Sequence, residues 1–513
     1  MRFPLSRLRT VLTYVGTILF VFGFLMLIPF LMSLVADPAA GQDVRGGTFA
    51  IPIFASLVLG SLCRWQVQHW RVPRRIGSPE AMLICVLSWV AVSAVGAIPF
   101  SYHLGVSYID AYFEAMSGFT TTGITMLSGL DAMPKSLLFW RSMTQWIGGL
   151  GILTFFMVIV YQGGVSYRLF GAESHKISGP RPAPGMWNTL KILWLVYVLL
   201  TTAVAGALYV CGVSLYDAVS HGFTCLSTGG YSPYDASIAH YEQAGFVHHV
   251  AIEYIIIFGM WAGGTNFLIH FRLIRGNLKA LWDSDEVRAW WTILGGSLLL
   301  IVGSRLYAIH MAPHTAGVDA QAALARDSLG ATFRHSLFQV VSIATTTGFG
   351  TRDIASGYFT PLARQVFLVL MVIGGCAGST GGGLKVIRMV ILWKQMVRQV
   401  RRVLKPPSEM ELVLVDGKRI GLEELFRTAG LFFAWVLLLF LGGITTAAFS
   451  QHGGYESASG MFSALGNIGP CYISVAQMAQ LNPAIKLVYI VGMLAGRLEI
   501  IPVLMLLSRR TWQ

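Results

Sequence analysis

The chain has 513 residues, of which 55% are hydrophobic and 12% are charged, and its formal net charge is +13. Soluble domains carry roughly 25% charged residues, so this composition excludes a soluble globular protein and predicts a bundle of apolar helices in a membrane. The basic residues lie in loops between apolar stretches and form no aromatic-rich basic domain, which excludes a nucleic-acid partner.

Ten apolar stretches are long enough to cross a bilayer, which takes about 20 residues. They are Val11–Val35, Thr48–Cys63, Pro79–Pro99, Ser136–Tyr161, Met186–Cys211, Val247–Phe271, Trp290–His310, Pro361–Met389, Glu424–Phe449 and Ile485–Leu507. The first is longer than the roughly 7–15 apolar residues of a signal peptide, so we expect it to remain as a span. An even number of crossings places both termini on one side.

Lysine and arginine gather in alternate loops. Of the 37 in the chain, 27 lie in residues 1–10, 64–75, 168–191, 272–288, 385–427 and 509–510. One topology puts all these segments on the same face, which the positive-inside rule makes cytoplasmic. Both termini are therefore expected in the cytoplasm.

Four short polar turns end on glycine, at spacings of 106, 119 and 121 residues. They are Thr121-Thr122-Gly123, Ser227-Thr228-Gly229, Thr346-Thr347-Gly348 and Asn467-Ile468-Gly469. Each follows an apolar segment too short to cross the membrane, and these segments are Tyr108–Thr120, Leu215–Leu226, Thr332–Thr345 and Tyr455–Leu465. Each repeat thus consists of an outward helix, a re-entrant helix, a glycine turn and an inward helix.

Non-helical backbone at membrane depth needs protein or water around it, so four such turns predict one shared aqueous axis. Glycine permits the dihedral angles that aim carbonyl oxygens at a cation, and threonine hydroxyls add oxygens at the inner end. The C-termini of the re-entrant helices also favour a cation there. A single Thr-Gly pair is usually an ordinary helix break, but four at matching positions favour a selectivity filter.

A glycine-rich run, Gly374–Gly383, interrupts the second helix of the third repeat with six glycines in ten residues. Each glycine costs a helix roughly 0.8–1.0 kcal/mol relative to alanine, so we expect a loop below the filter. Its small residues suit a movable gate made of Gly374, Gly375, Gly378, Ser379, Thr380, Gly381, Gly382 and Gly383. The alternative is a close helix-packing surface. Shorter breaks at Gly148–Gly151 and Gly263–Asn266 lie in the equivalent helices.

Arg497 lies inside the last apolar stretch. A charge at the bilayer centre costs at least about 2.5–3.5 kcal/mol, so it is expected to face a cavity or a partner. One interpretation pairs Arg497 with Glu499 or with loop carbonyls. The other, which is compatible with it, places Arg497 in the pore as an electrostatic barrier to cations.

Acidic residues near the outer turns are expected to concentrate cations at the mouth, although each one alone is more often a solvated loop charge. They are Asp110, Glu114, Asp131, Asp217, Asp235, Asp353 and Glu456. No nucleotide-binding loop, catalytic triad or clustered metal ligands stand out, and the six cysteines suggest buried thiols. We therefore expect no enzyme and no cofactor, with a cation as the bound and transported species.

The motifs resemble those of the Trk/Ktr/HKT superfamily of potassium transporters, and most closely the Trk-type potassium-uptake subunit of bacteria. The resemblance covers nearly the whole chain. Its carriers are Ser117–Gly123, Ser227–Gly230, Ala344–Phe349, Asn467–Pro470, Thr144–Gly149, Gly263–Phe267, Gly374–Arg388 and Gly496–Glu499.

The resemblance implies an intramembrane gating loop at Gly374–Gly383 and a pore arginine at Arg497. It also implies a homodimer and a separate cytosolic regulatory subunit that binds nucleotides. Sodium-preferring members carry serine at the first filter glycine, so Gly123 favours potassium. The fourth turn departs from Thr-Gly with Asn467-Ile468, and the outer loop Met311–Ser328 is not matched.

The expected fold class is an all-α polytopic membrane protein with four pseudo-symmetric membrane-pore-membrane repeats around a central pore. An N-terminal two-helix hairpin, residues 1–78, precedes repeats at 79–185, 186–285, 286–422 and 423–513. The expected function is K⁺ uptake across the bacterial inner membrane, with membrane lipid around the helices. The alternatives are a Na⁺-permeable member of the superfamily and a secondary transporter for a small solute, which would have two inverted halves.

Overall fold

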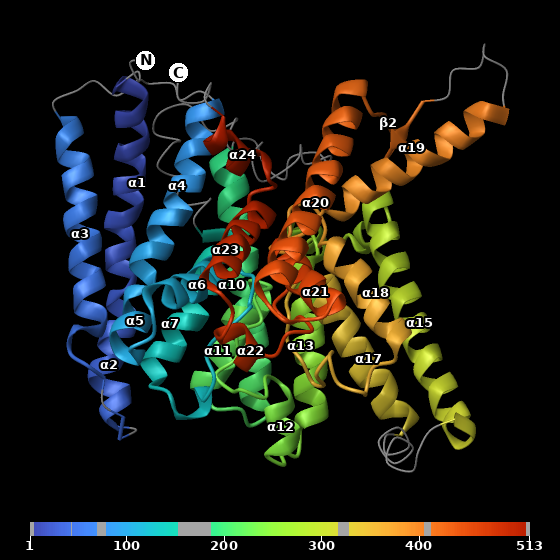
Figure 1. The fold of residues 1–513 in the computed structure, drawn as a ribbon, viewed down its shortest axis with the longest axis horizontal. Coiled ribbons are helices and arrows are strands. Elements are labelled where there is room, and N and C mark those ends of the chain that lie inside the picture. Colours follow the sequence, from blue (N-terminus) through green and yellow to red (C-terminus); the bar gives the residue numbers. More distant parts are fainter. Residues whose placement is uncertain are drawn as a thin grey trace.

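The computed structural model describes residues 5–39, 41–42, 44–68, 78–151, 186–315, 328–404 and 412–508. Within these ranges the chain is mostly helical, and its one sheet is a two-stranded hairpin. The long helices run roughly side by side, and α1 begins at the same face at which α24 ends (Figure 1). The all-α polytopic fold predicted from the sequence is confirmed by this arrangement.

The N-terminal hairpin consists of α1 (Leu5–Leu25), α2 (Leu27–Ala39) and α3 (Gly47–Gln68). Glycines allow α1 and α3 to approach closely, because a Cβ on Gly60 would lie only 2.7 Å from the Gly16 carbonyl oxygen. The sequence predicted one continuous span over Val11–Val35, whereas the helix is interrupted at Met26.

The first two repeats share one order of elements. The first contains α4 (Ser78–Gly96), α5 (Ile98–Leu104), α6 (Tyr108–Phe119), η1 (Leu130–Ala132), α7 (Lys135–Trp146) and the π-helical turn η2 (Ile147–Gly151). The second contains α10 (Met186–Val210), α11 (Leu215–Leu226), α12 (Ala239–Gln243), α13 (His249–Gly264), α14 (Phe267–Ile274) and η3 (Leu278–Leu281).

The last two repeats also place a long helix before the re-entrant helix, and these long helices are longer than α4 and α10. The third contains α15 (Asp285–Thr315), α17 (Leu329–Ala344), α18 (Pro361–Val372) and α19 (Val386–Leu404). Strands β1 (Leu414–Val415) and β2 (Lys418–Arg419) follow as an antiparallel hairpin. The fourth contains α20 (Leu422–Phe449), α21 (Gly454–Gly466), α22 (Val475–Ala479), α23 (Pro483–Arg497) and α24 (Ile501–Leu507).

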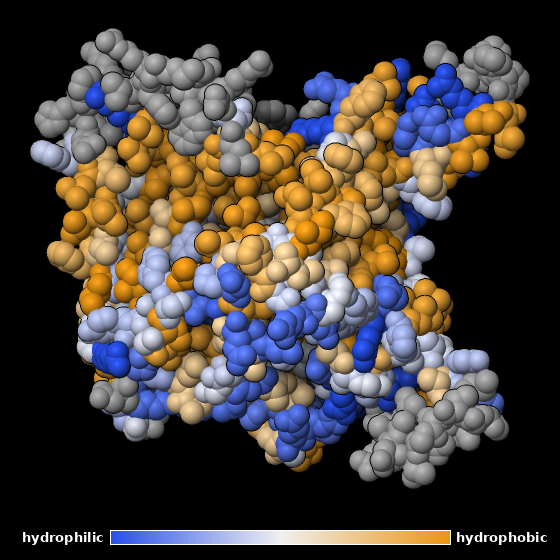
Figure 2. Space-filling model, viewed as in Figure 1, coloured by the Kyte–Doolittle hydropathy of each residue, from blue (hydrophilic) through white to orange (hydrophobic). Residues whose placement is uncertain are grey.

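Among the described residues, six stretches are long and apolar enough to cross a membrane: Leu8–Ala39, Gly47–Trp65, Pro79–Leu104, Asn188–Val210, Asp285–His310 and Leu422–Phe449. A seventh crossing would be the pair α13 and α14, which is bent by 109°. Figure 2 shows hydrophobic residues gathered in the upper part of the view and polar residues below. Exposed apolar side chains such as Phe54 and Phe433, each 70% exposed, suit contact with lipid.

Two of the other three predicted crossings are interrupted, and the third extends beyond the described residues. Ser136–Tyr161 is described only as far as Gly151, and Pro361–Met389 is interrupted between α18 and α19, as its glycines predicted. The expectation of one helix over Ile485–Leu507 is wrong. Glu499 (φ 63°) and Ile500 (φ 66°) adopt left-handed dihedrals and separate α23 from α24 directly after Arg497. Of the outer loop, α15 covers Met311 to Thr315, and residues 316–327 lie outside the described residues.

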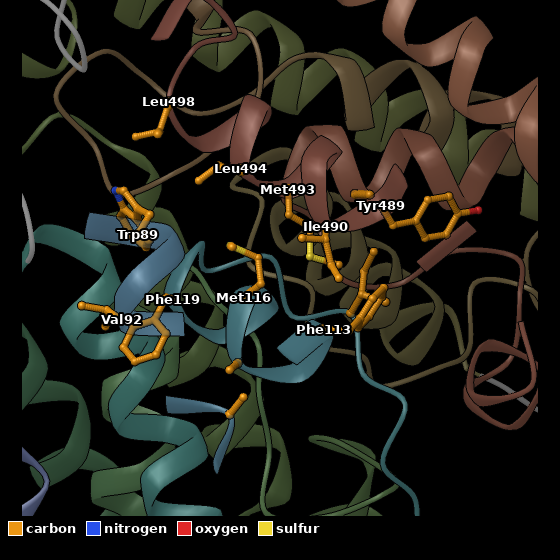
Figure 3. Close-up of a cluster of buried hydrophobic side chains, with 14 of the residues drawn as sticks. Trp89, Val92, Phe113, Met116, Phe119, Tyr489, Ile490, Met493, Leu494 and Leu498 are labelled. Atoms are coloured by element: carbon orange, nitrogen blue, oxygen red, sulfur yellow. The ribbon is translucent and has the colours of Figure 1, made fainter. Parts of the chain in front are cut away.

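The fourth repeat packs against the first and closes the bundle into a circle. Figure 3 shows Trp89 and Val92 on α4 and Phe113, Met116 and Phe119 on α6 near side chains of the last repeat. These partners are Tyr489, Ile490, Met493 and Leu494 on α23 and, just after it, Leu498. All ten are nearly or fully buried in one hydrophobic cluster. This seam packs the first re-entrant helix, α6, against α23 of the last repeat, so it positions the site.

Candidate functional site

The four re-entrant helices α6, α11, α17 and α21 end in the same backbone turn. The first residue of each turn has a positive φ without being glycine: Thr121 (51°), Thr228 (54°), Thr346 (60°) and Asn467 (54°). The next residue donates its N–H to the carbonyl five residues earlier, over 2.8–3.0 Å, in all four repeats. This ending satisfies helix carbonyls that would otherwise lack partners.

A glycine with positive φ stands two residues after each left-handed residue. These glycines are Gly123 (82°), Gly230 (76°), Gly348 (89°) and Gly469 (104°). The sequence assigned Gly229 to this position in the second repeat, and that register is wrong by one residue. Gly229 instead lies at the position that Thr122, Thr347 and Ile468 occupy in the other repeats.

The four turns form a closed ring in which each turn contacts the next. A Cβ added to Gly123 would lie 2.2 Å from the carbonyl oxygen of Gly229. The same atom on Gly230 would lie 2.0 Å from the Thr347 oxygen, and on Gly348 it would lie 2.1 Å from the Ile468 oxygen. On Gly469 it would lie 3.1 Å from the Thr122 oxygen, which returns the circuit to the first repeat. The four turns, which are far apart in the sequence, therefore lie in contact with one another.

Side chains behind the ring hold neighbouring turns together. Gln145 on α7 donates its Nε2 to the Gly229 oxygen (2.7 Å), and its Oε1 accepts from the Tyr231 N–H (3.0 Å). Asn467 donates its Nδ2 to Thr122 Oγ1 (2.8 Å) and to the Met493 oxygen (2.9 Å). The amide at the fourth turn, where the sequence lost its threonine, thus links the fourth repeat to the first.

The hydroxyls and amide at the left-handed positions are fully buried. Thr346 Oγ1 accepts from the Gly382 N–H over 2.8 Å, and Thr228 Oγ1 donates to the Ser227 oxygen over 2.6 Å. Among the described residues, Thr121 Oγ1 and Asn467 Oδ1 have no hydrogen-bond partner. Two buried side-chain oxygens at the ring are therefore free to accept a donor or a cation.

The Gly374–Gly383 segment is a non-helical loop packed directly against the ring. A Cβ on Gly382 would lie 2.6 Å from Asn467, and one on Gly381 would lie 3.1 Å from the Thr345 oxygen. Thr380 Oγ1 is 2.8 Å from the Leu226 oxygen, at the end of α11. The loop therefore touches three of the four re-entrant helix ends.

The loop is also held by backbone hydrogen bonds to the break between α13 and α14. The Cys376 N–H donates to the Gly264 oxygen (2.9 Å), and the Thr380 N–H donates to the Gly263 oxygen (3.1 Å). The Phe267 N–H donates in return to the Gly378 oxygen (3.1 Å). At the base of the loop, the Gly374 N–H donates to the Leu384 carbonyl oxygen (2.8 Å). Movement of this loop would break several specific bonds, so it is anchored in this conformation.

Arg497 binds carbonyl oxygens from two other repeats. Its Nη1 donates to the Thr380 oxygen (2.5 Å), and its Nη2 donates to the Gly148 (2.8 Å) and Gly149 (2.6 Å) oxygens. These carbonyls lie in the loop and in the π-helical turn η2. The expected contact with loop carbonyls is thus observed. The expected ion pair with Glu499 is wrong, because Glu499 pairs with the buried Arg388 of α19.

The acidic residues proposed for the mouth are mostly engaged elsewhere. Glu114 is fully buried and accepts from Arg141 Nε over 2.6 Å, which corrects its assignment to the mouth. Asp110 pairs with Lys486 over 2.6 Å, and Asp235 accepts the Gly129 N–H over 2.9 Å. Removing one partner of a buried ion pair strongly destabilises a protein, because the other charge is left buried without a counterion. Glu114 on α6 and Arg141 on α7 therefore hold these two helices together.

An ion pair on the outer segments links the second and third repeats. Arg352, just after the third turn, donates to both carboxylate oxygens of Glu242 on α12, over 2.7 and 3.3 Å. The hydrogen bond from Arg352 is the main cause that lowers the pKa of Glu242 below its usual value.

Because the folded pKa of Glu242 is depressed, this pair should stabilise the protein above the ordinary glutamate pKa. The contribution should be lost as pH falls through the lowered value. Thermal unfolding in detergent as a function of pH measures this, and Glu242→Gln should flatten that part of the profile. An equal acid response in both proteins would contradict the assignment.

Comparison with known proteins identifies the architecture. The profile of the TrkH family, described as a cation transport protein, matches residues 45–512. The chain belongs to the TrkH family. It is 35% identical over 515 residues to the Trk system potassium uptake protein TrkH of Salmonella typhimurium, covering 98% of this chain and 99% of that protein. The Escherichia coli K12 protein of the same name is 34% identical over the same shares.

The solved structures agree with this assignment. The crystal structure of the potassium transporter TrkH from Vibrio parahaemolyticus matches with a TM-score of 0.82 and 31% identity. The match covers 99% of this chain and 100% of that chain. The resemblance read from the sequence motifs is therefore confirmed at the level of family and fold.

Several site residues of this TrkH-family chain were not found from the sequence. Gly230 was passed over because Gly229 completes the Thr-Gly pair one residue earlier. Gln145 lies in the Thr144–Gly149 motif, but nothing in the neighbouring sequence indicates its bonds to two backbone groups of another repeat. Arg388 and Glu499 are 111 residues apart, so only the fold reveals that they pair.

Proposed function

We propose that this chain is a potassium-uptake permease of the bacterial inner membrane that conducts K⁺ through the ring of four turns. The observation that carries the proposal is the closed circuit of glycine-to-carbonyl contacts through all four repeats. The potassium substrate follows the names of the Salmonella and Vibrio relatives. The filter is made of Thr121, Thr122, Gly123, Ser227, Thr228, Gly229, Thr346, Thr347, Gly348, Asn467, Ile468 and Gly469, to which the backbone adds Gly230.

A ring of carbonyl oxygens replaces part of the hydration shell of a dehydrated cation. The C-terminal ends of α6, α11, α17 and α21 all reach this ring, so their partial negative charges add to its attraction for a cation. At the outer end Gly123, Gly230 and Gly348 are partly exposed, whereas the threonines before them are buried. An ion therefore enters from the glycine side and meets buried oxygens further in.

The Gly374–Gly383 loop and Arg497 close the inner end in this proposal. The loop lies against Thr346 and Asn467, directly inside the ring, and Arg497 fixes its Thr380 carbonyl. A guanidinium at this depth opposes the passage of a cation. Conduction then requires the loop and Arg497 to move apart.

The topology and partners follow the same proposal. Both termini lie in the cytoplasm, the repeats divide at residues 79, 186, 286 and 423, and the protein works as a homodimer. A cytosolic nucleotide-binding subunit of the Trk type binds the cytoplasmic helix ends and moves the gate. The concentration of lysine and arginine on that face supports this orientation.

The decisive experiment is cation flux into liposomes for the purified chain and for Gly123→Ser and Gly348→Ser. A serine Cβ at either position would displace a carbonyl oxygen that lies 2.1–2.2 Å from it. We expect the K⁺/Na⁺ preference to fall in both variants. Gly295→Ser on α15 is the control, because an added Cβ there meets no atom within 4 Å. An unchanged preference and rate in both variants would overturn the filter, and preferential Na⁺ flux in the unmodified chain would favour the sodium-permeable alternative.

A further inference from the structure

Glu286, in the first turn of α15, binds both the glycine loop and the helix that follows it. Its Oε1 accepts from the Ala377 N–H (2.7 Å) and from the Ile387 N–H (3.3 Å). Ala377 lies within the loop, and Ile387 lies in the first turn of α19, which follows it. The side chain is only 9% exposed. N–H bonds to a carboxylate are stronger than those to neutral acceptors, so one oxygen fastens the loop to the next helix.

The residue before Glu286 is held by the β1–β2 hairpin. Asp416 Oδ1 accepts the Asp285 N–H (2.6 Å), and the Asp416 N–H donates to Asp285 Oδ2 (2.9 Å). Lys394 Nζ bridges Asp285 Oδ2 (2.5 Å) and the Leu414 oxygen (2.8 Å). The first N–H groups of a helix lack intrahelical partners, so Asp416 supplies one that the start of α15 needs.

The hairpin also packs on the loop itself. Val413 and Val415 are buried in a small cluster with Ile387, Ile391 and Leu425, and Ala377 of the loop packs against this cluster. The Asp416-Gly417 turn has positive φ at both residues (49° and 72°), which gives the hairpin a defined shape. One compact element thus contacts the loop and supports the residue next to Glu286.

We propose that Glu286 is a positioning residue that holds the Gly374–Gly383 loop in its closed conformation, and that the β1–β2 hairpin controls this hold through Asp416. This inference rests on the proposed function, in which the loop is the gate. The inference gives a role to β1 and β2, the only strands among the described residues, which have no part in the proposed filter or in the contacts of Arg497.

The coupling follows from the position of the two acids in one helical turn. Asp285 and Glu286 are adjacent, so displacement of the hairpin withdraws the acceptor from the Asp285 N–H and frays the start of α15. Fraying moves Glu286 away from Ala377 and Ile387. A force on the hairpin is thereby converted into release of the loop, without any contact to the ion path.

The test uses Cys376, a loop thiol that is fully buried in this conformation. In full-length protein with the other five cysteines replaced by serine, the rate of maleimide modification of Cys376 reports loop release. We expect Glu286→Ala and Asp416→Ala to raise this rate by about tenfold or more, because each loses a bond to a charged acceptor. Asp416→Asn keeps the acceptor oxygen and should remain near the parent rate, as should the exposed control Glu423→Gln.

Flux of K⁺ into liposomes, measured on the same variants, separates this inference from the proposed function. Faster modification together with higher K⁺ flux supports both. Faster modification with unchanged flux supports the hold of Glu286 but overturns the loop as the gate. Modification at the parent rate in Asp416→Ala overturns the inference, and this half-exposed turn position keeps the test decisive if Glu286→Ala does not fold.

Discussion

Replacing Gly230 with alanine is expected to abolish selective K⁺ flux, whereas the same change at the neighbouring Gly229 should leave a measurable part of it. Gly230 has a φ of 76°, and an added Cβ would lie 2.0 Å from the Thr347 carbonyl oxygen. A left-handed conformation costs a residue with a Cβ roughly 1–2 kcal/mol. The contact would also push the Thr347 oxygen, which we propose coordinates the ion, out of the ring. The effect should therefore be on selectivity and folded yield together.

Gly229 is the matched control because its backbone does not need glycine. Threonine or isoleucine occupies the equivalent position in the other three repeats, and an added Cβ at Gly229 would meet the Gln145 side chain instead of backbone. The measurement is K⁺ and Na⁺ flux into liposomes, with size-exclusion profiles to confirm folded protein. If Gly229→Ala loses selectivity and Gly230→Ala keeps it, the backbone register derived for the second turn fails.

The four ring glycines should also differ among themselves. Gly123, Gly230 and Gly348 each face a carbonyl oxygen at 2.0–2.2 Å from an added Cβ, whereas the nearest atom to Gly469 lies at 3.1 Å. Alanine at position 469 should then be the least damaging of the four, although its φ of 104° still strains any residue with a Cβ. The four turns therefore share one backbone conformation but differ in how well they accept a side chain at the glycine.

The helical framework could be predicted because its signals are local. Re-entrant helices were expected at Tyr108–Thr120 and Leu215–Leu226, and α6 and α11 match these within one residue. Apolar length, a serine before the helix and a polar turn after it are all adjacent in sequence. The same locality explains the failure at Ile485–Leu507, where a uniformly apolar stretch gives no sign of the left-handed residues after Arg497.

The side-chain network of the site could not be predicted, because its contacts join distant repeats. Asn467 bonds to Thr122 across 345 residues, and Arg497 bonds to Gly148 across 349. The charge pattern even suggested a wrong pair, since Glu499 is two residues from Arg497 but binds Arg388. Left-handed φ values at Thr121, Thr228 and Thr346 are equally hidden, because threonine rarely adopts them outside a structure that enforces them.

The anchoring of the loop suggests how closed and open states are balanced. Its backbone bonds run mainly to the break between α13 and α14, while Arg497 and Glu286 hold it from two further sides. Each net hydrogen bond contributes only about 0.5–1.5 kcal/mol, so loss of a few bonds is enough to shift a two-state equilibrium appreciably. A loop held by many weak bonds can move without unfolding the helices around it, as the proposed gating requires.

Changing Arg497 to alanine is expected to raise K⁺ flux by at least about tenfold, because a barrier charge and a tether of the loop are lost together. A unit charge ~6 Å from a passing K⁺ opposes it by on the order of 3 kcal/mol at an effective dielectric constant of ~20. The guanidinium also donates to the Thr380 carbonyl of the loop and to the Gly148 and Gly149 carbonyls of η2.

Arg497→Lys separates these two contributions, because it keeps the charge but cannot present the planar fork that reaches three carbonyls at once. Flux in the lysine variant should lie between the parent and alanine levels if both contributions act. Flux equal to that of the alanine variant would assign the effect to the tether alone. The half-exposed Arg272 on α14 supplies a control, since its removal also lowers the positive charge by one without touching the ring. Lower flux in folded Arg497→Ala would instead make Arg497 a structural support of the open pore, in conflict with a role in closing it.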